Sequence, residues 1–487
     1  MTENENKADQ LINDKLKELE ENKDYKDIKE KLNEGNNFID YFLVLGLEPI
    51  IYRKTWLFDE TLEEINKKYK EDLKPKIISS FPNFKKSTTG FEDNILTHCF
   101  PKGFELMKAS KKPNKKIFSF ILDNNFYNLN YPQKYLTCLI FYESIIDYKI
   151  LSEIENNPEK NEIKSIDRAA IAAKIKNSDI FIPKCLLFIS LYPYFGEFEK
   201  IITEIYNYSL NLFTKITPYN SKTPLSKNNE TQYNNRTSPK RMSGFKEVGK
   251  ESGIYYPVDK IIENILIELP VPPRGVTTIK YFLNENEYTI KQNEMNQLPL
   301  IDVNINSIFT NFDVKDVITI YNYIFLEYRI LFFSKNIGLL NNYIYSLLSF
   351  LYPFQYQYQI ITILPKENFE VIESITPFIA GINQSFEEDI FNGYQLSDCI
   401  LVVDIDKGKY RIINETEDNK LPEFPTKYRK TFEKKLQDTV YKYLNKSSNK
   451  NSKKTKLLNL SYMEKRKEGL STPHPSSDTT CRVEALW

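Results

Sequence analysis

The stretch that decides the fold lies between residues 341 and 406, where helix-like and strand-like runs alternate. It reads NNYIYSLLSFLYPFQYQYQIITILP over residues 341–365, SITPFIAGIN over 374–383 and ILVVDID over 400–406. The opening run has the apolar spacing of a buried helix and stops at a proline. The later runs are short, β-branched and bounded by Pro or Gly, which is typical of buried strands. This alternation predicts an α/β unit, with helices covering a sheet.

Upstream of that stretch, several strands precede a helix, which predicts an α+β unit. The last strand, corner and amphipathic helix are expected in PKCLLFISLYPYFGEFEKIITEIYNYSLNL, residues 183–212. The preceding strands are expected in FIDYFLVLGLEP (38–49), KIISSFP (76–82), THCFPKGF (97–104), IFSFILDNN (117–125) and YLTCLIFYESI (135–145). Two lobes of different class are therefore predicted, an α+β N-lobe and an α/β C-lobe.

Shifts in composition set the predicted domain boundaries. Segments rich in Asn, Ser, Thr and Lys with few apolar residues cannot bury a core, so they are expected to be disordered. In chain order we predict a charged helical extension (1–36), the upstream lobe (37–216), a disordered linker (217–252), the α/β lobe (253–413), a short downstream helical segment (414–445) and a disordered tail (446–487).

Composition also limits the class of function. Lys+Arg and Asp+Glu both number 66, so the formal net charge is zero, which argues against a nucleic-acid binder. The five cysteines are far apart in sequence and form no CxxC pair, which predicts reduced thiols in a cytoplasmic protein. With two histidines only, no metal or cofactor is expected. No apolar run reaches the ~18 residues that span a bilayer, so any membrane association is expected to be peripheral.

The motifs with catalytic potential are weak. GFKEVGK (244–250) has the GxxxxGK spacing of a phosphate-binding loop, but Glu251 stands where Ser or Thr would hold magnesium, and no buried strand precedes it. Asp404 and Asp406 could share a metal, yet no third ligand follows at motif spacing, so we interpret them as solvated acids at a turn. The residues alone therefore favour a binding or regulatory protein over an enzyme.

Two local patterns suggest packing positions. His98 and Cys99 are expected on a strand, where neighbours point to opposite faces and cannot form a thiol–imidazole couple. Phe354, Tyr356 and Tyr358 are expected on one strand face, as a core or interface stripe. They lack the flanking basic residues of a base-stacking platform.

The order of these segments resembles the DENN family. ELPVPPRG (268–275), LEYRILFFSKNIGLL (326–340), LYPFQYQYQIITILP (351–365), SITPFIAGIN and ILVVDID resemble the central DENN block in order. Upstream, YFLVLGLEP, HCFP, FSFILDNN and CLLFISLYPYFGEFEKIITEIY resemble the family's N-terminal lobe, and LPEFP (421–425) resembles a spelling found in the larger endosome and Golgi proteins.

This resemblance implies a bilobal DENN architecture, with a longin-like N-lobe and an α/β C-lobe that hold a GTPase between them. It also implies the function of a guanine-nucleotide exchange factor for a Rab-type small GTPase, active in the cytoplasm and at endosomal or Golgi membranes. Such a regulator makes and breaks no covalent bond. It binds the switch regions, prefers the nucleotide-free GTPase and so promotes GDP release.

The resemblance also suggests residues for the site. Arg329, Gln357, Tyr358, Asn383 and Asp404 are expected to contact or support the GTPase. The residues expected to have architectural roles are Pro353, Gln355, Tyr356, Pro365, Pro377 and Gly381, the last by permitting a tight turn. Tyr356 and Tyr358 stand where the family usually has Trp and His.

Three alternatives stay open. A DENN fold could bind a GTPase or its regulators as a scaffold without accelerating exchange. It could favour GTP hydrolysis, which would call for a projecting arginine. An unrelated α/β enzyme is disfavoured by the missing motifs. The downstream segment is short for the family, which puts exchange activity in question.

Overall fold

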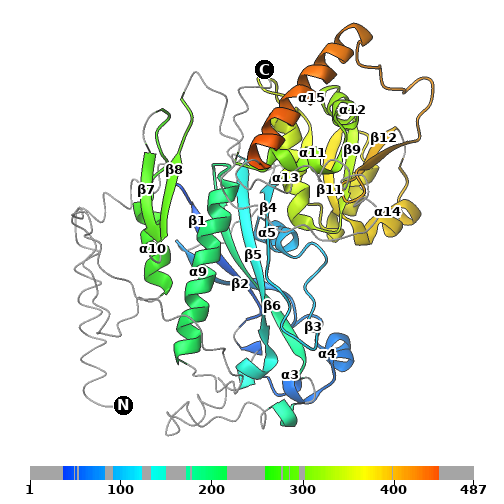
Figure 1. Cartoon of the computed structure of the whole chain (residues 1–487). Helices are drawn as coiled ribbons and strands as arrows, with labels where there is room; N and C mark the ends of the chain where they lie inside the picture. The colour runs from blue at the N-terminus through cyan, green and yellow to red at the C-terminus, as the bar shows by residue number, and fades with distance from the viewer. Residues whose placement is uncertain are drawn as a thin grey trace, which may run out of the picture.

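Two large sheets, each covered by helices, and one two-stranded hairpin organise the protein in the computed structural model (Figure 1). The structure describes residues 37–48, 50–51, 54–82, 91–122, 133–149, 172–175, 178–216, 258–275, 278–283, 286–294, 302–396 and 399–448. The predicted helical extension (1–36), the linker (217–252), the GFKEVGK motif and nearly all of the predicted tail lie outside these residues.

The upstream sheet is antiparallel, with strand order β2-β1-β6-β5-β4, and β3 pairs with β6. Its strands are β1 (Tyr41–Gly46), β2 (Lys76–Phe81), β3 (Met107–Lys108), β4 (Lys116–Leu122), β5 (Lys134–Ser144) and β6 (Ile180–Ser190). β5 and β6 are long and lie in the sheet interior, which explains why both are apolar along most of their length.

Helices cover both faces of this sheet. On one face, α9 (Phe195–Ile216) packs against Leu139 and Phe188. On the other face, α5 (Phe91–Cys99) packs against Leu136 and Leu187. Because neighbouring residues in a strand point to opposite faces, β5 and β6 supply both cores. The short helices α3 (Trp56–Asp59) and α4 (Leu62–Lys68) form a further core with Leu47, which follows β1, and with Ile180 and Ile182 at the start of β6.

The segment after the linker returns to the upstream sheet. Helix α10 (Val258–Glu268) and the hairpin of β7 (Thr278–Leu283) and β8 (Asn286–Lys291) share a core with α9 and β1, and α10 lies beside α9 (Figure 1). The predicted boundary at residue 253 assigned this segment to the α/β lobe, and the structure corrects that assignment. The amphipathic face of α10 buries Ile262 and Leu266 against this core.

The second sheet has the order β10-β11-β9-β12-β13, with β13 the antiparallel member. Its strands are β9 (Arg329–Ser334), β10 (Gln359–Ile361), β11 (Phe378–Asn383), β12 (Ile400–Asp404) and β13 (Lys409–Ile413). The helices of this unit are α11 (Ile308–Asn311), α12 (Val314–Phe325), α13 (Ile337–Ser349), α14 (Glu387–Gly393) and α15 (Thr426–Ser448). The mixed α/β content with several sheets is confirmed.

Two local predictions were wrong. Residues 97–99 end helix α5 and are not a strand; Ile95 and Cys99, four residues apart, both lie in the core. The aromatics of PFQYQYQ do not share a strand face, because residues 351–358 form turns and irregular chain. Tyr356 is buried, whereas Phe354 and Tyr358 are exposed.

The two units meet along a seam formed by β4 on one side and by α13 and the chain after β10 on the other. The backbone N–H of Ile121 donates to Thr362 Oγ1 at 3.0 Å, and Thr362 is fully buried. Ile363 joins the core on the α5 face of the upstream sheet. Tyr345 of α13 contacts Phe195 edge to face. The seam is therefore a packed apolar interface with a buried hydrogen bond.

Candidate regulatory surface

The residues expected at the GTPase site fall at two ends of the second sheet. Arg329 begins β9. At the other end of β9, Ser334 pairs with Asn383 and Phe333 pairs with Asp404. A six-residue strand is about 16 Å long. The structure therefore separates Arg329 from Asn383 and Asp404 by the length of the strands.

Gln357 and Tyr358 lie with Arg329 at the beginning of the strands. The Gln357 N–H donates to Glu327 Oε1 at 3.1 Å, and the Tyr356 hydroxyl donates to the Tyr328 carbonyl at 3.3 Å. Arg329 is buried and donates to the Ser374 carbonyl at 3.1 Å, so it supports the loop before β11. Gln357 and Tyr358 are exposed and available to a partner.

The opposite strand ends carry a polar cluster, here called the polar edge cluster: Ser334, Asn383, Gln384, Asp404, Asp406 and Lys407. Asn383 is buried and donates to the Lys335 carbonyl at 3.2 Å, so its role is support. Asp404 accepts from Lys407 through the backbone N–H at 2.9 Å and through Nζ at 2.7 Å.

Asp406 is held in a different way from Asp404. It accepts from Ser334 Oγ at 2.9 Å and from the Lys335 N–H at 2.6 Å. Asp404 is therefore satisfied within its own loop, whereas Asp406 is satisfied by the residues that follow β9. Within the described part of the chain, no three metal-ligating side chains converge at this edge.

The polar edge cluster borders the seam. The chain leaves β9 at Ser334 and enters α13, where a Cβ on Gly338 would lie 3.1 Å from the Ile117 carbonyl of β4. A protein bound at this edge would therefore lie next to the upstream sheet as well.

Gly381 has a role different from the tight turn expected for it. It lies inside the extended strand β11, and a Cβ there would lie 2.2 Å from the Thr362 carbonyl. The glycine permits a close backbone crossing, because the chain after β10 passes directly over the strand. The Leu364 N–H donates to the Gly381 carbonyl at 2.7 Å and fixes this crossing.

The prolines and Gln355 border these loops. Pro365 is buried at the end of the crossing, and the next N–H, of Lys366, donates to the Pro101 carbonyl at 3.2 Å across the seam. Pro377 is half-buried directly before β11, and Pro353 is exposed. Gln355 is also exposed, and its carbonyl accepts from Gln357 Nε2 at 2.9 Å.

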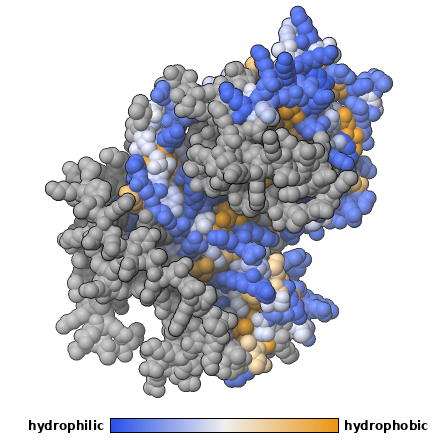
Figure 2. All heavy atoms as spheres, in the orientation of Figure 1, coloured by the Kyte–Doolittle hydropathy of each residue, from blue (hydrophilic) through white to orange (hydrophobic). Residues whose placement is uncertain are grey.

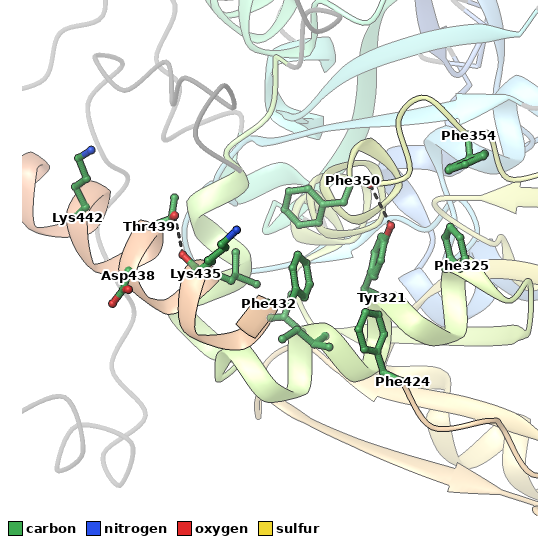
Figure 3. Close-up of a pocket in the computed structure, with 13 residues that line it drawn as sticks. Tyr321, Phe325, Phe350, Phe354, Phe424, Phe432, Lys435, Asp438, Thr439 and Lys442 are labelled. Atoms are coloured by element: carbon green, nitrogen blue, oxygen red, sulfur yellow. Dashed lines mark hydrogen bonds between the residues drawn. The ribbon is translucent and has the colours of Figure 1, made fainter. Parts of the chain in front are cut away.

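An aromatic groove of about 840 Å³ lies between α12, the turn after α13 and α15. Phe350, Phe432, Tyr321 and Phe424 point toward one another across it, with Lys435 and Lys442 along its α15 side (Figure 3). Around α15, at the upper right, the surface is mostly hydrophilic with hydrophobic patches exposed between (Figure 2). This groove was not predicted from the sequence; the helical spacing of Phe432, Leu436 and Thr439 is the signal that indicates it.

The described residues contain no helix with the length and apolar character that crossing a bilayer requires.

Two family profiles match the sequence, one after the other along the chain. The uDENN domain profile matches residues 75–141, which include β2 to β4 and most of β5. The DENN (AEX-3) domain profile matches residues 181–408, which include most of β6 and all of β7 to β12.

Similar proteins share only part of their length with this chain. DENN domain-containing protein 2A of Mus musculus is 27% identical over 178 residues, 36% of this chain and 18% of the relative. Elicitor of plant defense protein 1 of Verticillium dahliae is 24% identical over 156 residues, 32% of this chain and 13% of the relative. DENN domain-containing protein 3 of Mus musculus is 24% identical over 186 residues, 37% of this chain and 14% of the relative. The matched part spans less than a fifth of each relative.

Proposed function

The chain belongs to the DENN-domain family, and we propose that it is a guanine-nucleotide exchange factor for a Rab-type small GTPase. Members of this family generally act in that way. The observation that carries the proposal is that the two family segments together build both sheets, which meet at one packed seam bordered by polar strand ends. In this proposal the antiparallel sheet is the longin-like lobe of a bilobal regulator.

The proposed mechanism is a difference in binding free energy. A GTPase bound at the seam and the strand ends would be held in its nucleotide-free form, and linkage then requires that GDP bind more weakly to the complex. Gln357 and Tyr358 are the proposed contacts because they are exposed, and Asp404 is proposed as a contact through its ion pair with the exposed Lys407. Arg329 and Asn383 are proposed to support them from buried positions.

The test is release of fluorescent GDP from a panel of Rab-type GTPases in the presence of the full chain. We expect faster release from at least one member. Replacing both Gln357 and Tyr358 by Ala should slow that release about tenfold, which corresponds to a loss of about 1.4 kcal/mol in transition-state stabilisation. Tyr428→Ala is the matched control, because Tyr428 is an exposed tyrosine on α15.

The same assay separates the alternatives. Saturable binding with unchanged GDP release would replace the exchange function by a scaffold function. Faster GTP hydrolysis would indicate an activating protein. We also propose that the protein acts in the cytoplasm and reaches endosomal or Golgi membranes through its GTPase. A tagged chain that stays on membranes after that GTPase is removed would contradict this route.

A further inference from the structure

Three of the five cysteines converge at one point inside the upstream sheet. Cys99 ends α5, Cys138 lies in β5 and Cys185 lies in β6, and their sulfur atoms all lie within 4.8 Å of one another. All three side chains are fully buried in the core between the sheet and α5. Their distance in sequence hid this cluster, because Cys138 and Cys185 lie on neighbouring strands but are 47 positions apart in the chain.

We propose that Cys99, Cys138 and Cys185 form a three-coordinate thiolate site for a soft monovalent metal ion of the Cu(I) class. Thiolate sulfur is the ligand that such ions prefer. An ion in the plane of three sulfurs, at a metal–sulfur distance of about 2.3 Å, requires sulfurs about 4 Å apart. At the observed limit of 4.8 Å, each sulfur would have to move inward by about 0.5 Å, which rotation of the side chains can supply.

The surroundings favour this class of ion over zinc. Structural zinc sites are four-coordinate, and no His, Asp or Glu ligand atom joins the three sulfurs among the described residues. The nearby His98 ring stacks on Phe120, and its Nδ1 lies 2.7 Å from the Asn94 carbonyl oxygen. The core around the sulfurs is apolar, and the described residues there offer an ion soft sulfur ligands.

The thiols must lose their protons to coordinate the ion, and they would release them to solvent as it binds. Burial raises the pKa of Cys99 and Cys138 well above the ordinary value, so the bound ion, and not the empty core, would hold these sulfurs as thiolates.

The test begins with the full chain produced in copper-supplemented cells and purified under anaerobic conditions. We expect about one copper ion per wild-type chain, and X-ray absorption should show about three sulfur ligands near 2.3 Å. Cys138→Val should reduce the copper content at least tenfold, because loss of one of three ligands removes a large share of the affinity. Cys399→Val is the matched control, a buried cysteine outside the cluster, and it should retain copper.

A second experiment covers slow entry, since the closed core gives an ion no direct route to the sulfurs. Chain unfolded in denaturant is refolded with Cu(I) or with Zn(II) and then exposed to a chelator. Wild-type chain should retain copper and lose zinc, and circular dichroism should confirm that both variants fold. Three results would show that the three thiols serve packing alone. These are equal copper content in Cys138→Val and wild type, coordination of copper through nitrogen or oxygen, and no retained copper in either experiment.

Discussion

His98 is the residue whose burial has the clearest consequence for stability. It is 1% exposed, and burial lowers its pKa from 6.5 to about 4, although a hydrogen bond to the Asn94 carbonyl opposes this shift. The folded protein therefore holds His98 neutral at a pH where the unfolded chain binds a proton. The free energy of unfolding therefore has its full value above pH 6.5, and it decreases as the pH falls toward 4, because the unfolded chain binds a proton that folded His98 does not.

Replacing His98 by Gln should remove this pH dependence. Between pH 7 and pH 4 the free energy of unfolding of the wild type should fall by about 3 kcal/mol more than that of His98→Gln. Denaturant titrations of both proteins at several pH values measure the difference, and other titrating groups cancel in it. Parallel curves for the two proteins would show that His98 binds a proton as readily in the folded state as in the unfolded chain.

Gly381 gives a second prediction at this scale. Gly381→Ala would place a methyl group 2.2 Å from the Thr362 carbonyl, so β11 and the crossing chain must separate. We expect a loss of about 3 kcal/mol in the free energy of unfolding, measured by denaturant titration. Gly393→Ala is the control, because a Cβ at that position meets no atom within 4 Å. Equal stability of the two variants would contradict the close crossing.

Among the elements, α9 depends on a residue far away in sequence. Asp302 accepts a hydrogen bond from the Glu197 N–H at 3.1 Å, in the first turn of α9. The free N–H groups at a helix start need such an acceptor. Asp302→Ala should therefore lower the free energy of unfolding by about 1 kcal/mol, whereas Asp302→Asn should lose less, since its amide oxygen still accepts. The thermal midpoints of both variants measure this difference.

Some strands of this fold can be predicted from the local pattern of apolar residues, and others cannot. β4, β5, β9 and β12 follow directly from apolar runs bounded by turn residues, because a buried strand needs only its own side chains to be recognised. The strand expected at 97–104 was wrong, because a short apolar run is compatible with both helix and strand.

Non-local packing was beyond the sequence pattern. α10 and its hairpin return to the upstream sheet, and three cysteines of α5, β5 and β6 converge; neither follows from spacing along the chain. For the proposed GTPase site, the residue types came from a family resemblance. Their division between two strand ends depends on register, which only the folded sheet defines.

For the whole molecule, the seam between the two units should contribute directly to cooperative folding. Thr362→Val keeps the shape of the side chain but leaves the buried Ile121 N–H without its acceptor, which should lower the free energy of unfolding by about 2 kcal/mol. Thr362→Ser retains the hydroxyl and should retain the hydrogen bond. If Thr362→Val and Thr362→Ser unfold at the same denaturant concentration, this contact does not join the units.

The position of β4 has a consequence for how the chain avoids association with itself. β4 is the last strand of its sheet, so one row of its backbone groups has no strand partner, and such a row is a template for aggregation. In this molecule α13 and Thr362 cover that row. Until residues 337–364 have been synthesised and have folded, the unpaired edge of β4 would be exposed to other chains. Packing of these later residues on β4 then protects the upstream sheet from aggregation.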